Sequence, residues 1–584
     1  MSGRTTNQDA GTAGPSPRLD SWKEIATHLK RAVRTVRRWE RQEGLPVHRH
    51  LHGKQATVYA FAHEIDTWLE GRTAEGGADQ FPVDRAPQPS AGPGSETPKK
   101  ARHRPILIAV LPLNNLGGDP EQERFADGLT EELISEIGHC CPNRLRVIAL
   151  TSVMPYKQSP KSIPQIREEL GADDILEGGI RLDGPRVRLS ARLIAARDQA
   201  HVWMDSYEIQ LPPISSLQQS LARHVADSLA VALHARPEER RHRAPVPRVA
   251  AHSAYLEGTS HFLPTEADST KSIEHLNLAI ERDPKFAPSY AELALTYLRR
   301  LIWDYPPIVI FGRIEEYASK SLKLDPKLAR AHSMMAAFHL FRARAWSKAE
   351  RSSRRAIELN PSDAWAHIVR AAYDLVVGEL DEAIEELRLA RQLDPKSRET
   401  GLWFAIFAYF ARRYDLAAKH CQEIRQLDPS SAFLHMALGL NLVQAGEYAL
   451  ALSHCEKARE LGGSSISQIS RACSIYALAG ERDTAERLFQ ELVAAEETQY
   501  TRYIFLAHAS ACLGKDQQTL EWLDKAYEQH EPLLVFLKTD PRFDSVSRLG
   551  GFRNLLRLIG LPDDAGRPLA EPPGSFRTIA AGNS

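Results

Sequence analysis

Residues 324–361 read LDPKLARAHSMMAAFHLFRARAWSKAERSSRRAIELNP, and this stretch decides the fold because the Leu-Asx-Pro tripeptide at its start returns at its end. The prolines of four such tripeptides, Pro326, Pro361, Pro395 and Pro429, follow one another at intervals of 35, 34 and 34 residues. A repeat of this length is one unit that buries its apolar face only against its neighbours. The sequence therefore predicts a stack of repeated units.

The residues between the prolines have the pattern of paired helices, because small residues stand where two helices would cross closely. In the clearest unit these markers are Leu438, Gly439, Gly446, Tyr448, Ala451, Ala458 and Gly463. The pattern and the period resemble tetratricopeptide repeats. The resemblance implies an α-solenoid over residues 251–560, with room for eight units between 251 and 530 and a cap at 534–561. Such curved surfaces bind protein segments or other copies of the chain.

The composition divides the 584 residues into modules and linkers. Apolar residues make up 43% and charged residues 26%, which excludes a wholly disordered or fibrous chain. Stretches rich in Pro, Gly, Ser or Arg are expected to be flexible. We therefore expect a multidomain, mainly α chain: a disordered arm at 1–17, a small helical domain at 18–70, a linker at 71–104, an α+β domain at 105–235, a basic linker at 236–250, the repeats with their cap at 251–560, and a disordered tail at 561–584.

The domain at 18–70 has the pattern of two short helices and a wing. Residues 21–24 (Ser-Trp-Lys-Glu) form a capping box at the start of the first helix. Val33, Val36 and Trp39 recur on one side of a second helix. The β-like stretch at 57–61 then predicts the wing.

Positive charge is concentrated in this domain, although the whole chain has a formal net charge of −1. Residues 30–54 hold eight Lys or Arg and two Glu, an excess of six positive charges. A basic second helix suits major-groove reading, because Arg donates two hydrogen bonds to guanine while phosphates attract the surrounding charge. A charge run can also be a solvated helix face, but the turn, the helix stop and the wing favour nucleic-acid binding.

Residues 35–40 (Thr-Val-Arg-Arg-Trp-Glu), followed by Gly44-Leu45, resemble the recognition-helix signature of MerR-like and excisionase-like winged helix-turn-helix proteins. The resemblance implies that the second helix meets the major groove and that the wing lies along the backbone or minor groove. The candidate DNA-binding residues are Arg34, Thr35, Arg37, Arg38 and Arg41 on the helix, and His48, Arg49, His50 and Lys54 on the wing. The long dimerisation helix of full MerR regulators does not follow the wing, so the manner of dimerisation stays open.

The domain at 105–235 alternates strand and helix patterns. The expected strands are 106–111, 145–150, 175–179 and 186–194, and the expected helices are 125–137, 163–170 and 214–233. The motifs at 109–116, 125–130, 176–178 and 200–203 resemble the FlgO-like, or TolB amino-terminal-like, domain. In that family the domain often lies between an effector such as a nucleotide cyclase and a tetratricopeptide array. The resemblance implies no catalytic residue.

No pattern in the chain predicts catalysis, a cofactor or a metal site. The acidic residues Asp127 and Glu131 are more simply explained as helix-start charges than as a carboxylate site. His48, His50 and His52 alternate along a strand, but no fourth ligand or nearby cysteine accompanies them. Phosphate-loop, zinc-protease, nucleophile-elbow and kinase motifs do not occur. We therefore expect a protein that is not an enzyme.

Six scattered cysteines without a CxxC pair indicate reduced thiols and a cytoplasmic location. The apolar run at 105–113 is far shorter than the ~20 residues that span a bilayer, so no membrane partner is expected. The sequence thus predicts a bacterial-type transcription regulator that binds double-stranded DNA and uses its repeats to bind a protein or to form a homodimer. The alternatives are a non-enzymatic scaffold and an accessory protein of a nucleotide-cyclase pathway.

Overall fold

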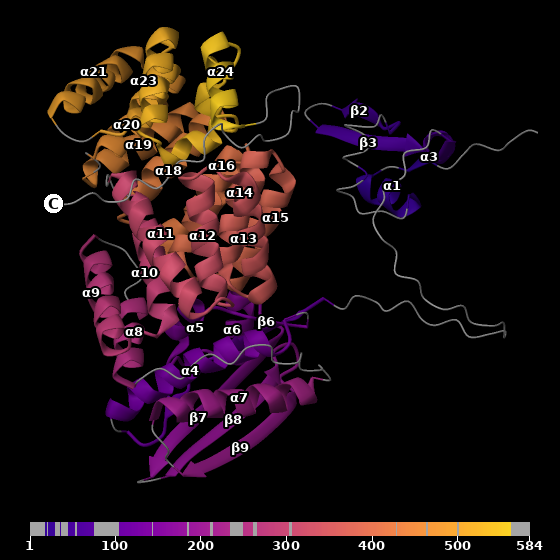
Figure 1. Ribbon diagram of the computed structural model, residues 1–584, viewed down its shortest axis with the longest axis vertical. Helices are drawn as coiled ribbons and strands as arrows, with labels where there is room; N and C mark the ends of the chain where they lie inside the picture. The colour runs from indigo at the N-terminus through magenta and orange to yellow at the C-terminus, as the bar shows by residue number, and fades with distance from the viewer. Residues whose placement is uncertain are drawn as a thin grey trace, which may run out of the picture. The chain divides into compact units, whose positions relative to one another are not determined.

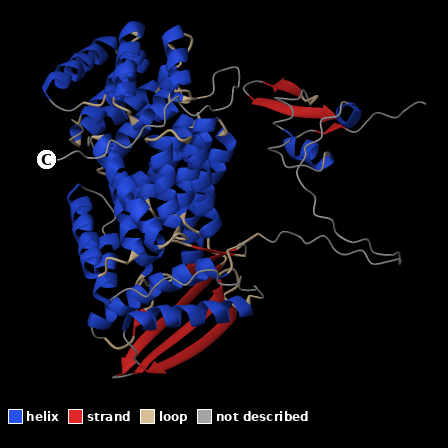
Figure 2. Ribbon diagram, viewed as in Figure 1, coloured by secondary structure: helices blue, strands red, loops and turns tan. Residues whose placement is uncertain are grey.

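The structure is a computed structural model that divides into two compact units, residues 1–100 and 101–584. It describes residues 18–19, 21–29, 36, 45–52, 55–74, 104–118, 120–142, 144–183, 186–210, 214–233, 249–260, 266–302, 306–427, 429–462, 465–498 and 501–561. Most of these residues are helical (Figure 2). The expected arm at 1–17, much of the linker at 71–104, most of the basic linker and the tail after 561 lie outside the described residues.

The N-terminal unit is a small sheet with helices packed against it. Its elements are β1 (Arg18–Leu19), α1 (Trp22–His28), β2 (His48–His52), β3 (Gln55–Phe61) and α3 (Ala62–Ala74). The strands pair antiparallel in the order β1-β3-β2. The Ser21 hydroxyl accepts a hydrogen bond from the backbone N–H of Glu24 at 3.2 Å, which confirms the predicted helix start.

The second unit begins with an α+β domain whose sheet has the order β6-β4-β7-β8-β9. Its strands are β4 (Ile106–Val110), β5 (Asn114–Asn115), β6 (Leu145–Val147), β7 (Asp174–Asp183), β8 (Arg186–Ala195) and β9 (His201–Gln210). Strands β6, β4 and β7 run parallel, β5 also pairs with β7, and β7, β8 and β9 form an antiparallel meander. Helices α4 (Pro120–Cys140) and α7 (Ile214–Ala232) lie against the sheet (Figure 1).

The strand and helix pattern of this domain was largely predictable. Strand β8 alternates exposed and buried residues as its sequence indicates, and α6 (Ile163–Leu170) ends at Gly171, whose φ of 68° suits glycine. Between β6 and α6 lie α5 (Leu150–Val153) and the 3₁₀ turn η1 (Met154–Tyr156). The prediction omitted β9, because this edge strand carries exposed Val202 and Met204 beside polar residues and has no clean alternation.

Eight helix pairs follow in the described part of the chain, which confirms a helical repeat solenoid. They are α8 (Val249–Ser260) with α9 (Glu266–Arg282), α10 (Ala287–Arg299) with α11 (Pro307–Leu324), α12 (Ala329–Phe341) with α13 (Trp346–Leu359), α14 (Ala364–Val377) with α15 (Leu380–Leu393), α16 (Arg398–Phe410) with α17 (Tyr414–Leu427), α18 (Ala432–Gln444) with α19 (Tyr448–Glu460), α20 (Ile466–Ala479) with α21 (Arg482–Thr498), and α22 (Tyr503–Cys512) with α23 (Asp516–Glu528). The 3₁₀ turn η2 (Arg300–Ile302) extends α10.

The residues that define the period have direct structural roles. In the turns after α11 and α13, Asp325 and Asn360 each accept a hydrogen bond from the backbone N–H two residues further on, at 2.9 Å. In α18, a Cβ on Gly439 would lie 3.2 Å from the carbonyl oxygen of Ala451 in α19. Glycine therefore permits the close crossing that the sequence pattern predicts.

The first helices of the pairs form the inside of the array, and the second helices form its outside. Helix α14 is buried over nearly its whole length, and it contacts the first helices α12 and α16 on either side. Helix α13 buries Trp346, Ala349, Ser353 and Ala356 and exposes charged residues between them. Buried inner helices and partly exposed outer helices are the burial pattern expected of a curved stack of amphipathic helical hairpins.

The array curls far enough for distant repeats to touch. The guanidinium of Arg299, in the second pair, lies 2.9 Å from a carboxylate oxygen of Glu399, in the fifth pair. The Arg502 side chain, at the start of the eighth pair, donates a hydrogen bond to the carbonyl oxygen of Leu301 at 3.4 Å. The inner surface is therefore a tight groove with contacts across it.

The chain after α23 makes contacts beyond those of the expected terminal cap. It forms the 3₁₀ turns η3 (Pro532–Phe536) and η4 (Pro541–Phe543), and then α24 (Gly550–Ile559), which contacts α23. Turn η3 contacts α12 and α14, which belong to the third and fourth pairs. Turn η3 therefore returns into the groove, whereas η4 and α24 contact the last helix pair.

The α+β domain and the repeats share a hydrogen-bonded junction that the sequence pattern does not predict. Asp394, which follows α15, accepts hydrogen bonds from the hydroxyls of Thr151 and Ser152 in α5, the latter at 2.6 Å. The backbone N–H of Ala149 donates to the carbonyl oxygen of Leu393 at 2.8 Å. The Leu-Asp-Pro turn of one repeat thus also holds the neighbouring domain.

Candidate functional site

In the N-terminal unit, His48, one of the predicted DNA contacts, is hydrogen-bonded within the unit. His48 Nε2 lies 2.6 Å from a carboxylate oxygen of Glu64 in α3, and the His48 ring stacks on Tyr59 at 5.2 Å between centroids. Arg49 and His50 follow on β2, opposite Val58 and Thr57 of β3.

The predicted recognition helix lies largely outside the described residues. This applies to Arg34, Thr35, Arg37, Arg38 and Arg41, and Lys54 also lies outside the described residues. Val36 is described, and its side chain is fully buried in a core with Ile25, Leu45 and Ile65. The burial of Val36 confirms that this position faces the inside of the unit, as the spacing of Val33, Val36 and Trp39 predicts.

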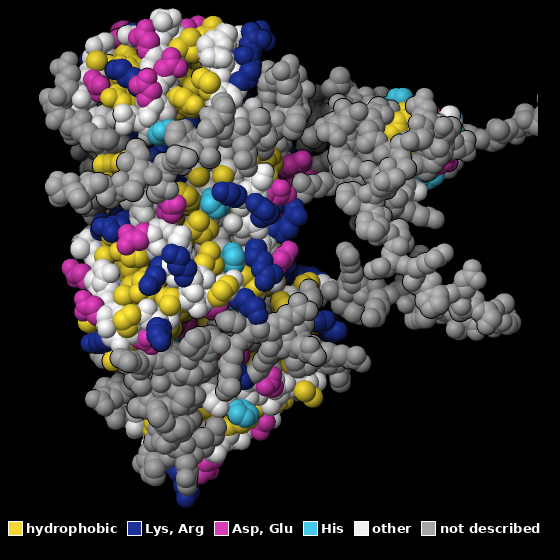
Figure 3. All heavy atoms as spheres, viewed as in Figure 1, with side chains coloured by type: hydrophobic (Ala, Val, Ile, Leu, Met, Phe, Trp, Pro, Cys, Tyr) yellow, Lys and Arg dark blue, Asp and Glu magenta, His cyan; other side chains and the backbone are white. Residues whose placement is uncertain are grey.

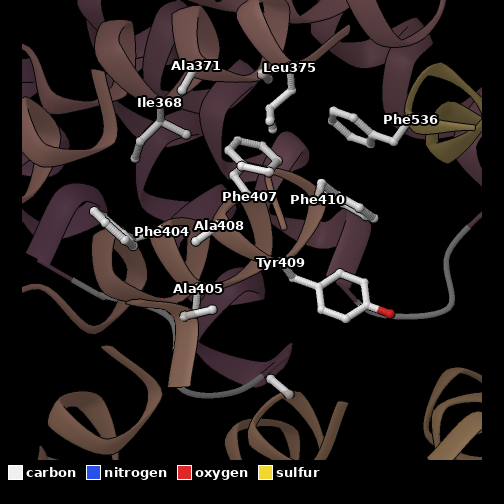
Figure 4. Close-up of a cluster of buried hydrophobic side chains, with 14 of the residues drawn as sticks. Ile368, Ala371, Leu375, Phe404, Ala405, Phe407, Ala408, Tyr409, Phe410 and Phe536 are labelled. Carbon is white, nitrogen blue, oxygen red and sulfur yellow. The ribbon is translucent and has the colours of Figure 1, made fainter. Parts of the chain in front are cut away.

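A second candidate site lies in the groove of the repeats, where the chain's own C-terminal segment covers the inner helices. Phe536 of η3 stacks on Phe410 of α16, and it also contacts Phe407 and Phe341, at centroid distances of 5.6 and 5.9 Å. Figure 4 shows Phe536 beside Phe407 and Phe410. The inner surface of the central repeats is thus already packed against an aromatic residue of the same chain.

Beside Phe536 the groove keeps a cavity of about 140 Å³. Its walls are mainly apolar and aromatic, and they come from the first helices of the pairs and from η3: Trp365, Trp403, Phe407, Phe410, Phe505 and Phe536. Polar side chains also reach the wall, among them Asn441 of α18 and His508 of α22. An apolar cavity with a few placed polar groups is the usual form of a small-molecule site.

A buried polar cluster fixes the C-terminal segment at one end of this cavity. Asp540 accepts hydrogen bonds from the Arg542 guanidinium at 2.6 and 2.9 Å, and it lies 3.0 Å from His508 Nε2. Despite burial, the cationic Arg542 beside it holds the pKa of Asp540 well below its usual range. The ionised carboxylate therefore orients the imidazole.

A second buried carboxylate ties the same segment to α22. Glu531 accepts hydrogen bonds from the backbone N–H groups of Tyr503 and Ile504 at 2.6 and 3.4 Å. These are the first residues of α22, where backbone N–H groups lack partners within the helix. Burial raises the pKa of Glu531, and the nearby Arg502 opposes that rise. The segment thus supplies a cap to a helix of the groove.

The acidic residues of α4 gather at the border between the α+β domain and the repeats. Burial and the nearby carboxylates of Glu132 and Glu292 raise the pKa of Glu131 to about 8. Burial and Glu136 raise the pKa of Glu132 to about 7. No group of three or more His, Cys, Asp or Glu side chains within the described ranges could hold a metal ion.

The cysteines are core residues rather than nucleophiles. Cys421 and Cys455 hold the same place in successive repeats, and both are fully buried. Burial raises the pKa of both thiols to about 12, so neither forms a thiolate readily. No disulfide occurs among the described residues.

The outer face of the repeats carries charged side chains and also exposed apolar ones such as Ile308 and Tyr448. Lys and Arg side chains gather over α13 to α15 on the face shown in Figure 3. The exposed residues of α13 include Arg354 and Arg355, which pair with Glu350 and Glu358. Among the described residues, no helix is long and apolar enough to cross a membrane.

Sequence reasoning missed the polar residues of the cavity wall, among them Asn441 and His508. Asn441 interrupts an apolar helix, because residues 438–443 read Leu-Gly-Leu-Asn-Leu-Val. His508 likewise stands in residues 504–509, which read Ile-Phe-Leu-Ala-His-Ala. A polar residue on the inner side of an apolar helix was the signal that could have indicated this site.

No protein-family model matches the chain. A curated protein of Rhizobium meliloti (strain 1021), named "Putative adenylate cyclase 3", is 33% identical over 225 residues. These residues are 38% of this chain and 37% of the relative, so the chain spans little more than a third of that protein's length.

Three solved structures are among those similar to this chain. PilF of Pseudomonas aeruginosa is 18% identical, with a TM-score of 0.29, and covers 40% of this chain and 99% of its own. A tetratricopeptide repeat protein from Parabacteroides merdae is 15% identical (TM-score 0.30; 46% and 99%), and yeast Tom70 is 14% identical (TM-score 0.30; 52% and 66%). The assignment of a repeat solenoid rests on the 34-residue period and the eight helix pairs.

Proposed function

We propose that this chain is a cytoplasmic, DNA-binding transcription regulator whose N-terminal unit contacts double-stranded DNA. The observation that supports this most directly is the burial of Val36 in the core of that unit. On a helix with 3.6 residues per turn, Arg34, Arg38 and Arg41 lie about 140–160° around the axis from Val36. The same helix that buries Val36 would therefore turn these guanidinium groups to the outside.

The excess of six positive charges in residues 30–54 supplies the attraction to phosphates. The β2–β3 hairpin stands at the place in the sequence where the wing is expected. One small DNA-binding unit binds weakly alone, so the proposal includes a protein partner or a second copy of the chain, held by the repeats. Because η3 and Phe536 already occupy the central groove, this partner would use the outer helices or displace the C-terminal segment.

The test compares two arginine variants with a matched control in the full-length chain. Arg38→Ala and Arg34→Ala should weaken binding to a mixed-sequence duplex and reduce the salt slope by about 1 each, measured by fluorescence anisotropy. Arg355→Ala is the control, because this arginine is exposed on α13 and pairs with Glu358 at 3.2 Å. Equal affinities and equal salt slopes for all three variants and the wild type would refute the assignment of this helix.

A second candidate function, an accessory protein of a nucleotide-cyclase pathway, is favoured by the name of the Rhizobium relative. The shared 225 residues amount to 37% of that relative, so the likeness concerns a part of it. An accessory protein would change the activity of a separate adenylate cyclase, so the assay adds the purified chain to such a cyclase with ATP and Mg²⁺ or Mn²⁺. A change in the rate of cyclic AMP formation would favour the cyclase pathway, and cyclic AMP made by the chain alone would overturn the expectation that the chain is not an enzyme.

A further inference from the structure

The groove cavity has the size of a single aromatic ring. Its volume of about 140 Å³ is close to that of engineered apolar cavities, of about 150 Å³, that bind benzene. Most of its wall is apolar and aromatic, and Figure 4 shows Phe407, Phe410 and Phe536 of this wall close together. A ring that enters this space is removed from water and gains contacts with other rings.

The wall also carries three guanidinium groups, and none of the described residues that line it is acidic. The three groups belong to Arg471 of α20, Arg502 at the start of α22 and Arg542 of η4. Each lies over an aromatic ring of the same wall, at 4.9 to 5.8 Å from the ring centroid; the rings are those of Phe433, Phe505 and Tyr409, in that order. These cation–π contacts hold the planar guanidinium groups against the apolar lining.

Two of these guanidinium groups act on one buried side chain, the imidazole of His508. Burial lowers the pKa of His508 most, and Arg542 and Arg471 lower it further, to about 4, although Asp540 opposes them. The imidazole is therefore neutral at neutral pH and adds no charge of its own. The positive charge at this end of the cavity thus comes from the two arginines.

Arg542 has donors beyond those that it gives to its own ion pair. Its Nε and Nη2 donate hydrogen bonds to Asp540 at 2.9 and 2.6 Å, whereas its Nη1 donates none to the described residues. A guanidinium group has five N–H donors in a fixed fork, and its hydrogen bonds to a carboxylate are of the strong, charge-assisted kind. A second carboxylate can therefore bind to Arg542 while Asp540 keeps its place.

We propose that the cavity binds an aromatic carboxylate with a single ring, of the benzoate class. The ring fills the apolar space, and the carboxylate accepts hydrogen bonds from Arg471 and Arg542 at the end of the cavity near His508. A neutral ring of the same shape lacks the charge that attracts these groups, and a carboxylate without a ring leaves the apolar space unfilled. This inference does not rest on DNA binding, since it concerns residues of the second unit alone.

The experiment measures binding of benzoate, benzamide, toluene and acetate to the full-length chain at neutral pH by isothermal titration calorimetry. Benzoate should bind at least about tenfold more tightly than each of the other three, a difference of about 1.4 kcal/mol. Equal affinities for benzoate and benzamide would overturn the role of the charge, and equal affinities for benzoate and acetate would overturn the role of the ring. No heat with benzoate would overturn the site.

Variants locate the binding. Arg471→Gln removes one guanidinium group from the wall and leaves the Arg542–Asp540 pair in place, so the benzoate-to-benzamide ratio should fall at least about tenfold. Arg487→Gln is the matched control and should keep the wild-type ratio, because Arg487 is exposed on α21 and bonds to Thr484 at 3.1 Å. Ala372→Leu fills the cavity from α14 and should abolish binding of benzoate, benzamide and toluene.

Circular dichroism and the melting temperature of each ligand-free variant show whether it is folded. If Ala372→Leu does not fold, Ile406→Phe is the second filling variant, because Ile406 lines the cavity and is only half-buried. A folded filling variant that binds benzoate as the wild type does would place the ligand elsewhere and refute the proposal. So would a folded Arg471→Gln chain that keeps the full preference for benzoate over benzamide.

Discussion

Phe536 stacks on Phe410 with ring centroids 4.6 Å apart and an angle of 15° between the ring planes. The two residues belong to the C-terminal segment and to the fifth helix pair, so the contact joins parts of the chain that are 126 positions apart. The surface that an open tetratricopeptide array would offer to a peptide is here part of the hydrophobic core. The C-terminal segment is therefore part of the structural core of the repeats.

Replacing Phe536 by Ala should destabilise the repeats strongly. The side chain is 2% exposed, and Phe-to-Ala changes in cores cost about 3–5 kcal/mol. The measurement is urea unfolding of the full-length chain followed by circular dichroism. Leu558→Ala is the control, because Leu558 of α24 is 38% exposed and should change the stability by less than about 1 kcal/mol. Equal midpoints for the two variants would show that η3 is not part of the core.

Replacing Asp394 by Ala should loosen the junction between the α+β domain and the repeats. The change leaves the hydroxyls of Thr151 and Ser152 without their shared acceptor, at a cost of about 1–3 kcal/mol or more. Hydrogen exchange should rise in α5 and in β6 beside it. Asp325→Ala alters the same turn position of an earlier repeat, where the carboxylate accepts from Lys327, and should leave exchange in α5 unchanged. Slow exchange in α5 of the Asp394 variant would contradict the junction.

The stability of the chain should depend on pH because of Glu131, which lies in α4 at the border between the α+β domain and the repeats. Its pKa is raised to about 8 in the folded chain, whereas an unfolded glutamate titrates near 4.5. Between these values the folded state binds more protons than the unfolded state, so stability falls as the pH rises from about 4.5 to about 8. Glu131→Gln should weaken this dependence and raise the melting temperature at pH 8 by roughly 2–4 °C.

The control for this pH dependence is Glu168→Gln, because Glu168 is exposed on α6. Melting temperatures of both variants and of the wild type are compared at pH 5.5 and pH 8. If Glu131→Gln and the wild type lose the same number of degrees between the two pH values, Glu131 is not the group that titrates.

The repeated part of the fold could be predicted because its signals are local. A proline every 34 residues and small residues such as Gly439 at the helix crossings define the pairs without any long-range information. The strands of the α+β domain were also visible, except the two-residue strand β5 and the edge strand β9. These elements follow from the period of apolar residues alone.

The groove site could not be predicted, because it depends on contacts between residues far apart in the sequence. Asn441 and His508 line one cavity although they are 67 positions apart, and Phe536 reaches it only after the chain turns back into the groove. The tail from residue 534 shows an apolar pattern that fits a terminal cap equally well. Whether such a segment folds inward depends on its packing against the aromatic residues inside the array. The local sequence pattern gives no information about that packing.

The central claim, that this chain binds DNA through its basic N-terminal unit, is tested most directly by the salt dependence of that binding. Fluorescence anisotropy of the full-length chain with duplexes selected from a random pool should give an affinity that falls log-linearly with salt. With about six phosphate contacts, the loss between 50 and 200 mM salt should be roughly a thousandfold. Binding that is absent at 50 mM salt, or that does not change with salt, would contradict the claim.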